Sequence, residues 1–433
     1  MIRHPLDRSG SRITRLRGAC ARRLSEADIR LAEMRDGEAI NRMAYDPAIS
    51  RAGDDPAGSP RPLRCGPEAM TATSPHGARL TIDLRALEAN WRRLAEEAAG
   101  AECAAVIKAD AYGTGIDRAG PALWRAGCRT FFVAHLSEAE RARAALPEAV
   151  IYVLNGLPPG SAPAYRDRAL RPVLGSREEI EEWAAFCRAR GERLPAALHV
   201  DTGMNRLGLS PDAALALAGG AALEDVAASL LVSHLVSAEV PGDAVTARQV
   251  ADFARVAAAF PGLTASLGNS AGTFLGARAR HEMVRPGYAL YGGNPRPGGP
   301  NPMRPVVRLD ATILQVRDVP PGATAGYNAR WTAPGPRRLA TLSLGYADGY
   351  PRAGSGRAEA VVAGRRCPVV GTISMDLVIL DVTDAPPEAA RRGARATLIG
   401  EGLDIDEVGQ RAGTIGYEIL TNLGRRSERA YID

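Results

Sequence analysis

The feature that most constrains the fold is an alternation of short apolar runs with helix-forming segments, which begins near residue 78. Strands that alternate with helices indicate an α/β class built from parallel βα units, and eight units predict a (β/α)8 TIM barrel. An open doubly wound sheet is the alternative, but no glycine-rich dinucleotide fingerprint follows the first run. The eight β-prone runs are Cys103–Lys108, Thr130–His135, Val150–Leu154, Arg171–Leu174, Ala197–Asp201, Ser229–Leu235, Thr264–Asn269 and Met283–Leu290.

The sequence pattern of the chain changes near residue 300. Stretches such as "RPVVRLDATILQVRDV" and "AEAVVAGRRCPVV" are β-branched runs divided by Gly and Pro. They predict a mainly antiparallel β domain over residues 301–433, with a short helix near residues 404–412. We therefore assign residues 77–300 to the barrel. Residues 1–76 are polar, turn-rich and without period, which predicts a disordered extension or a start codon misassigned upstream of Met70.

Composition excludes several classes of partner. The formal net charge is +5, but residues 1–69 hold 13 Arg against 10 acidic residues, so the remainder presents no basic face for nucleic acid. No apolar run approaches the roughly 20 residues that span a bilayer, so no membrane partner is expected. The six cysteines are widely spaced without a CxxC pair, which is typical of reduced thiols in a cytoplasmic protein. No metal site is expected.

Lys108 is the only lysine in the chain, because the other 53 of the 54 basic residues are arginine. It ends an apolar run, and the carboxyl ends of barrel strands carry the chemistry. Arginine can replace lysine where only a positive charge is needed. It cannot replace a neutral amine that attacks a carbonyl or acts as a base. The pattern therefore favours amine chemistry at Lys108 over the chance survival of one surface lysine.

Two further segments are typical of a phosphate site. "NSAG" at 269–272 follows the seventh run, and "RPGYALYG" at 285–292 covers the eighth. Barrels commonly bind phosphate in the loops after strands 7 and 8. Ser270 offers a hydroxyl and Gly287 allows close backbone approach. A lysine amine beside a phosphate site in a barrel suggests pyridoxal 5′-phosphate (PLP).

The motifs "VIKADAYGTG", "VDTGMNRLG", "SHLVSAE", "GNSAG", "MVRPGYALYG", "LGYADGYPR", "VVGTISMDL" and "GTIGYEIL" occur here in the order seen in alanine racemases. Over residues 78–433 the chain resembles that PLP-dependent isomerase family. The resemblance implies a PLP-binding barrel followed by a β domain, working as a head-to-tail homodimer with shared active sites. It also implies interconversion of L- and D-alanine, which supplies D-alanine for peptidoglycan.

The resemblance assigns roles to residues. Lys108 would form the Schiff base with PLP and act as the base on the D-alanine side. Tyr346, from the partner subunit, would be the opposing base for L-alanine. His234 would link this tyrosine toward Arg285, which faces the pyridine nitrogen. A guanidinium only donates hydrogen bonds, so the ring nitrogen must accept.

The remaining implied contacts concern the phosphate and the substrate. Arg206 and the backbone amide of Met375 would bind the substrate carboxylate, with Asp376 in support. Asp201 and Asn205 are interpreted as structural. The implied phosphate contacts are Tyr112, Ser270, Gly287, Tyr288 and Tyr417.

Two positions depart from the family pattern. Thr114 stands where many members have histidine, without an evident functional consequence. His199 stands where several members have a lysine that becomes carbamylated and braces the equivalent of Arg206. Because the chain has no second lysine, we expect His199, another side chain or a bound anion to hold Arg206 instead.

Other functions of the same fold group remain alternatives. A racemase of broader specificity, for example toward serine, would differ only in the size of its pocket. A PLP decarboxylase should lack the tyrosine of "GYADG" and pair glutamate with the ring nitrogen, so Tyr346 and Arg285 argue against it. A non-enzymatic PLP carrier would lack the C-terminal β domain.

Overall fold

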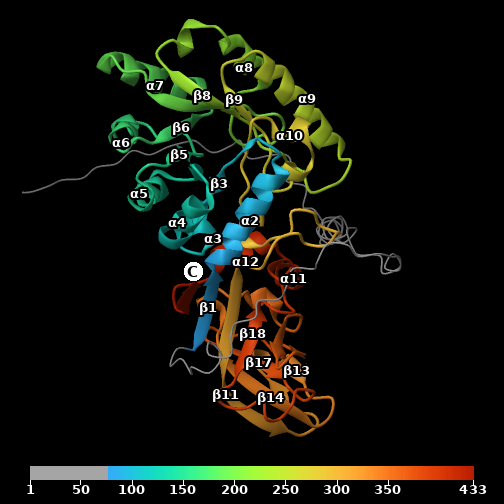
Figure 1. Cartoon of the computed structure of the whole chain (residues 1–433). Coiled ribbons are helices and arrows are strands. Elements are labelled where there is room, and N and C mark those ends of the chain that lie inside the picture. Colours follow the sequence, from blue (N-terminus) through green and yellow to red (C-terminus); the bar gives the residue numbers. More distant parts are fainter. Residues whose placement is uncertain (1–76) are drawn as a thin grey trace, which may run out of the picture. The chain divides into compact units, whose positions relative to one another are not determined.

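The computed structural model describes residues 77–433, and the predictions for residues 1–76 lie outside this range (Figure 1). A curled parallel sheet follows chain order from β3 to β9. Buried, β-branched and aromatic residues fill strands such as "TFFV" and "VIYV", as expected of strands covered on both faces. The strands are β3 (Ala105–Val106), β4 (Thr130–Val133), β5 (Val150–Val153), β6 (Arg171–Leu174), β7 (Pro195–His199), β8 (Ala227–Val232) and β9 (Thr264–Ser266).

The eighth run closes the ring by a different pairing. β10 (Met283–Val284) pairs in parallel with β2 (Glu102–Cys103), which directly precedes β3. On its other side, the amide of Glu282 donates to the carbonyl of Ala265, 3.2 Å away, beside β9. The predicted TIM-type barrel is thereby confirmed, and its last strand is shorter than the predicted run because "PGYALYG" turns away as a 3-10 helix, η4 (Tyr288–Tyr291).

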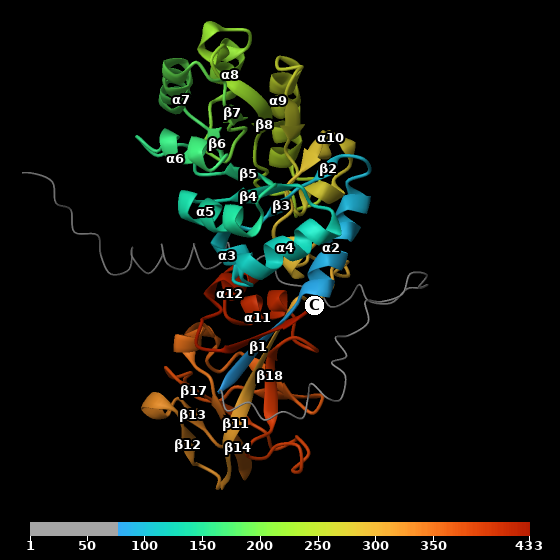
Figure 2. The ribbon, with the colours of Figure 1, turned by 60° about the vertical axis from the view of Figure 1, so that its left-hand side comes forward.

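Helices flank the parallel strands (Figure 2). Their ends follow from local sequence: in α7 the Ser176 hydroxyl caps the Glu179 amide at 3.2 Å, and the Glu179 carboxylate returns to the Ser176 amide. The helices of this part are α2 (Leu84–Glu97), α3 (Lys108–Tyr112), α4 (Ile116–Ala126), α5 (Leu136–Ala145), α6 (Ala162–Asp167), α7 (Arg177–Arg190), α8 (Pro211–Leu217), α9 (Ala244–Ala258) and α10 (Ala277–Arg280).

The C-terminal part is a mainly antiparallel sheet, as predicted. The long strand β11 (Val307–Val319) pairs antiparallel with β1, β14 and β18. The predicted short helix is α11 (Ile405–Arg411), and α12 (Gly416–Asn422) follows it. The strands are β1 (Ala78–Asp83), β12 (Thr324–Ala325), β13 (Trp331–Thr332), β14 (Arg337–Ser343), β15 (Glu359–Val362), β16 (Arg365–Pro368), β17 (Leu377–Asp381), β18 (Arg395–Ile399) and β19 (Glu428–Ile432).

The position of strand β1 in the sequence differs from its position in the fold. It precedes the barrel in sequence, yet it pairs antiparallel with β11 and parallel with β19. An ion pair between Arg79 and Glu428, 3.1 Å apart, supports the second pairing. The strand therefore belongs to the sheet of the C-terminal part, whereas the sequence pattern places residues from 77 onward in the barrel.

One large core joins the two parts of the described chain. Most buried apolar side chains of the described residues form one cluster from Ala78 in β1 to Leu423 beyond α12, and Ala325, Leu339 and Val370 form a second, small one. Four cysteines are described, and all four are buried and unpaired: Cys103, Cys128, Cys187 and Cys367. None of the helices between residues 77 and 433 combines the length and the apolar character needed to cross a membrane.

Candidate active site

Lys108 lies directly after β3, at the carboxyl end of the first strand of the parallel sheet. The three residues that follow, Ala109 to Ala111, have φ near +54° and ψ near +50°, and Tyr112 continues at φ 52°. The turn after the lysine is therefore left-handed. Residues with a β-carbon rarely adopt this conformation in succession, since each costs about 1–2 kcal/mol. The surrounding structure must hold the turn in place.

Several charged groups surround the Lys108 amine. Burial lowers its pKa below the ordinary lysine value, the nearby Arg206 guanidinium lowers it further, and the Glu138 carboxylate opposes both. Burial and then the Arg285 charge lower the pKa of His234 to about 3, and Lys108 contributes to the same effect. These influences indicate that Lys108, His234, Arg206 and Arg285 share one electrostatic environment.

Arg285 is buried and held by backbone and hydroxyl oxygens. One Nη donates to the carbonyl of Ser266 at 2.7 Å and also to the Ser266 hydroxyl, and the other Nη donates to the carbonyl of Ser233. Burial lowers the pKa of this guanidinium to about 10, so it stays cationic at neutral pH. Within residues 77–433 no group accepts a hydrogen bond from its Nε. The side chain is fixed by three of its five N–H donors, and the Nε is one of the two that have no acceptor among the described residues.

Gln249, on α9, is a site residue that the sequence analysis missed. Its buried amide nitrogen donates to the His234 carbonyl at 2.9 Å and to the Thr202 hydroxyl at 3.2 Å. Its oxygen accepts from the Val236 amide at 2.9 Å. Gln249 therefore fixes the segment that carries His234 against the loop that carries Arg206. Helical glutamines are usually exposed, so only the buried position reveals this role.

In the segments predicted to hold phosphate, two backbone amides bind the side chain of Ser270. The Ser270 hydroxyl accepts from the Gly287 amide at 3.1 Å and from the Ala289 amide at 3.2 Å. A β-carbon at Gly287 would lie 2.3 Å from the Tyr112 hydroxyl, so only glycine allows this approach. The structure thus brings Tyr112, Ser270 and Gly287 together, as the sequence predicted.

Tyr288 and Tyr417 join this group from opposite parts of the chain. Their rings stack with centroids 3.9 Å apart, and the Tyr112 ring lies 6.2 Å from that of Tyr417. The Tyr288 hydroxyl donates to Asp406 of α11 at 2.6 Å, and the same carboxylate accepts from the Asn294 amide at 2.9 Å. Asp406 was not predicted, and it ties the loop after β10 to the C-terminal helices.

The donors of this group fit a phosphate. Tyr112 is buried, yet none of the described residues pairs with its hydroxyl. Tyr417 is 42% exposed, and its hydroxyl likewise has no partner within residues 77–433. A buried hydroxyl normally has a hydrogen-bond partner, so the Tyr112 hydroxyl beside Ser270 and Gly287 is a donor available to a bound anion, and the Tyr417 hydroxyl can add a second. Together with the Lys108 amine and the Nε donor of Arg285, these groups suit PLP.

Hydrogen bonds fix the backbone of the loop that carries Arg206, but no described residue binds the Arg206 side chain. Asp201 accepts from the amides of Gly203 and Met204, at 2.8 Å each, and Asn205 takes a left-handed φ of 54°. This agrees with the structural interpretation of Asp201 and Asn205. The exposed Arg206 side chain has neither a hydrogen bond nor an ion pair with the part of the chain described. A direct bond from His199 is therefore not seen, and bracing of Arg206 stays a prediction.

Tyr346, Met375 and Asp376 form a second group in the C-terminal part. The Tyr346 amide donates to the Ser374 carbonyl at 3.1 Å, and the Ala347 amide donates to the Met375 carbonyl at 3.0 Å. Tyr346 is 40% exposed and Met375 is 53% exposed. The Met375 amide finds no acceptor among residues 77–433.

Arg426, another residue missed from sequence, joins the two loops of this group. Its guanidinium lies 2.9 Å from Asp376 and 3.5 Å from the buried Asp348. Asp348 in turn accepts from the Gly345 amide at 2.8 Å. Between the described members of this tyrosine group and those of the Lys108 group, the structure records no hydrogen bond, ion pair or ring contact.

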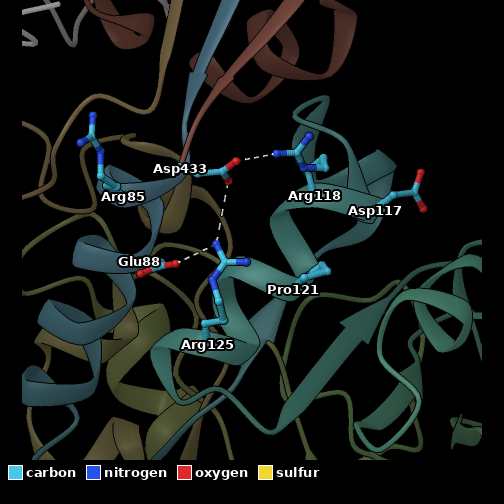
Figure 3. A pocket seen from close by; sticks show the side chains of 7 residues that line it. All are labelled: Arg85, Glu88, Asp117, Arg118, Pro121, Arg125 and Asp433. Carbon is cyan, nitrogen blue, oxygen red and sulfur yellow. Dashed lines mark hydrogen bonds and ion pairs between the residues drawn. The ribbon is translucent and has the colours of Figure 1, made fainter.

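Two cavities were compared with these residues. One, of about 490 Å³, contains none of the predicted residues (Figure 3). Two of its three arginines are already paired: Arg118 with Asp433 at 2.8 Å and Arg125 with Glu88 at 3.1 Å. The other, of about 310 Å³, lies beyond the ends of β5 and β6 and reaches His199. The arrangement of donors identifies the candidate site better than the volume of either cavity.

Comparison with known proteins finds two family matches along the chain. The family description "Alanine racemase, N-terminal domain" matches residues 82–295, and "Alanine racemase, C-terminal domain" matches residues 306–431. An alanine racemase of Methylobacterium sp. (strain 4-46) is 99% identical over 364 residues, which cover 84% of this chain and 100% of that protein. An alanine racemase of Methylobacterium nodulans is 78% identical over 364 residues, covering 84% and 98%.

Solved structures agree with these sequence relatives. The crystal structure of alanine racemase from Bartonella henselae with covalently bound pyridoxal phosphate is 40% identical. It superimposes with a TM-score of 0.79 and covers 83% of this chain and 100% of that one. Matches to both family domains and to a nearly identical relative show that the chain belongs to the alanine racemase family.

Proposed function

We propose that this chain interconverts L-alanine and D-alanine with PLP as its cofactor. The observation that carries the proposal is the placement of the only lysine at the carboxyl end of β3, among groups that share its electrostatic environment. Unpaired phosphate donors and a fixed arginine support it. Bound PLP would supply the electron-withdrawing system that acidifies the α C–H bond of an amino acid.

Racemisation requires a proton donor or acceptor on each face of the α-carbon. Lys108 serves one face, because burial and Arg206 lower its pKa and so raise the fraction of neutral amine that can accept a proton. Tyr346 serves the other face with its phenolic oxygen, and His234 lies on the cofactor side as a neutral imidazole.

The other residues bind and orient. Tyr112, Ser270, Gly287, Tyr288 and Tyr417 hold the phosphate or shape its loop. Arg285, which can only donate, would offer its Nε to the ring nitrogen of bound PLP, and that nitrogen would then have to accept. The substrate carboxylate binds Arg206 and the unpaired amide of Met375, and His199 and Asp376 support these two groups.

We also propose that two copies share their sites. Tyr346 and Met375 are exposed, and no hydrogen bond, ion pair or ring contact joins their described surroundings to the Lys108 group of the same chain. An exposed catalytic tyrosine with a free backbone donor beside it is what a head-to-tail homodimer would use to complete the partner's site. The proposed setting is the cytoplasm, where buried unpaired thiols persist, and the proposed role is supply of D-alanine for the cell wall.

Borohydride reduction of the PLP-loaded protein tests the cofactor attachment directly. Trypsin cleaves unmodified protein after Lys108, giving peptides 94–108 and 109–118. A pyridoxyl group on Lys108 blocks this cleavage and leaves peptide 94–118 with the added mass. Absence of the label from this peptide would reject Lys108 as the attachment site.

Kinetics with single enantiomers test the two bases and the substrate. We expect Lys108→Arg to lose racemisation and Tyr346→Phe to lower kcat about 10²–10⁴-fold. In Tyr346→Phe, exchange of the α-hydrogen of L-alanine with solvent should slow more than that of D-alanine. Comparable kcat/KM values for serine and alanine would favour the broader-specificity racemase instead.

A further inference from the structure

Glu138 contacts the backbone beside the only lysine. One of its oxygens accepts from the Ala109 amide at 2.6 Å. The other accepts from the amides of Ala134 and His135, at 2.8 and 3.2 Å, which precede α5. Glu138 is the third residue of α5, and its return to the backbone before the helix is a common capping arrangement. The bond to Ala109 is additional, because it crosses to the left-handed turn.

A second residue of α5 holds the same turn. Arg141 lies 3.0 Å from Asp110, and the Asp110 carboxylate also accepts from the Ile116 amide at 3.0 Å. Glu138 and Arg141 are three residues apart and therefore lie on one face of α5. This face binds two consecutive residues of the turn, a backbone donor through Glu138 and a carboxylate through Arg141.

The turn requires such support. Ala109, Asp110 and Ala111 adopt left-handed dihedral angles that alanine and aspartate disfavour by about 1–2 kcal/mol each. Since Lys108 immediately precedes these residues, a relaxed turn would redirect its side chain. The carboxylate of Glu138 also opposes the influence of burial and Arg206, which lower the pKa of the Lys108 amine.

We propose that Glu138 is a positioning residue for Lys108: its carboxylate clamps the Ala109 amide, fixes the left-handed turn and supplies the counter-charge beside the amine. The inference rests on the proposed function of Lys108. It assigns to α5 of the barrel a direct part in the geometry of the reactive amine.

The single lysine makes the test unusually direct. Reductive methylation of the full chain, freed of cofactor, with ¹³C-formaldehyde gives one dimethyl-lysine NMR signal, separate from that of the α-amine. In Glu138→Gln, which keeps the shape and removes the charge, the Lys108 amine should titrate at a lower pH than in wild type. Glu138→Asp keeps the charge on a shorter side chain and should titrate between the two.

Hydrogen exchange and kinetics provide two further readouts. Exchange of the backbone amides over residues 109–115 should be about tenfold faster in Glu138→Gln, because a charge-assisted bond is lost. With PLP bound, kcat should fall about tenfold while KM for alanine changes little. Glu140→Gln is the matched control, since Glu140 lies on the same helix but pairs with Arg168 at 3.1 Å. It should resemble wild type in every measurement.

The outcomes distinguish a Glu138 that positions Lys108 from a Glu138 that only stabilises the fold. A Lys108 titration unchanged in both Glu138 variants would overturn the proposal, even if exchange became faster. Equal effects of Glu140→Gln and Glu138→Gln would overturn it as well. Both cofactor-free measurements are independent of racemase activity. Failure of borohydride labelling at Lys108 would therefore reject the proposed function while these two measurements still reported on the clamp.

Discussion

Two partly buried histidines, His199 and His234, have cationic side chains nearby, and these neighbours help to determine their protonation. Burial, then Arg285 and Arg206, lower the pKa of His234 to about 3. Burial and Arg285 lower the pKa of His199 to about 4, although Asp201 acts in the opposite direction. Both imidazoles are therefore neutral at neutral pH, and each offers one acceptor nitrogen to the surrounding donors.

This protonation predicts that the protein loses stability in mild acid. The unfolded chain binds a proton at His234 with a pKa near 6.5, whereas the folded chain does so only near 3. Between these values the unfolded state binds more protons, so the free energy of unfolding falls as pH falls, by an amount on the order of a few kcal/mol. Denaturant unfolding without cofactor, at about pH 7.5 and about pH 5, should show a smaller loss in His234→Gln than in wild type.

The control for this prediction is His135→Gln, which removes an exposed histidine instead. It should retain the full acid-induced loss of stability. Equal losses in His234→Gln and wild type would contradict the interpretation that a neutral His234 is a feature of the folded state.

At the scale of elements, the approach between the turn after β3 and the loop after β10 depends on one glycine. A β-carbon at Gly287 would lie 2.3 Å from the Tyr112 hydroxyl and 2.9 Å from its ring carbon Cζ. The Tyr112 ring cannot easily retreat, because it stacks on Tyr291 with centroids 4.6 Å apart. In Gly287→Ala we expect a loss of about 1–3 kcal/mol in the free energy of unfolding and about tenfold weaker PLP binding. Denaturant unfolding and a PLP absorbance titration measure both.

Gly299→Ala is the matched control for that substitution. A β-carbon at Gly299 would meet only the Arg296 carbonyl, at an ordinary 3.7 Å. This variant should unfold and bind PLP like wild type. A Gly287→Ala protein with unchanged PLP affinity would show that the phosphate loop does not depend on this close approach.

Elements with local signals could be predicted from the sequence, and elements that depend on distant partners could not. The apolar runs of the barrel and the β-branched runs after residue 300 carry their own pattern, so the fold class followed from them. β1 has an equally clear strand pattern, but its partners β11 and β19 lie more than 200 residues away. The left-handed turn at Ala109–Ala111 has no signal either, because alanine and aspartate do not favour it.

The same distinction applies to the candidate site. Lys108 could be found because it is the only lysine, and the phosphate loop because glycine and serine follow the last strands. Gln249, Glu138 and Arg426 are long polar side chains, which sequence patterns assign to exposed surface. Only their contacts with the backbone or carboxylates of site segments distinguish them, and those contacts exist only in the folded chain.

At the scale of the whole molecule, the two predicted bases lie in separate groups. The exposed Tyr346 has backbone and neighbouring contacts only within the C-terminal part, through Ser374 and the loop that Arg426 secures. Lys108 belongs to the barrel group. No hydrogen bond, ion pair or ring contact between these groups is recorded within residues 77–433. The proposal that a second copy donates Tyr346 accounts for this separation.

Mixed dimers can test this arrangement, because Lys108→Ala and Tyr346→Phe each inactivate a different group. Co-expression of the two variants with different affinity tags, followed by two-step purification, isolates the heterodimer. If Tyr346 acts in the partner's site, one of its two sites combines an intact Lys108 with an intact Tyr346. Racemisation should then recover to about half the wild-type kcat per dimer, whereas each variant homodimer stays inactive. If Tyr346 served its own chain, both sites of the heterodimer would lack one base. A heterodimer as inactive as the two homodimers would therefore refute sharing of the site, and the wild-type heterodimer carrying the same two tags controls for the purification.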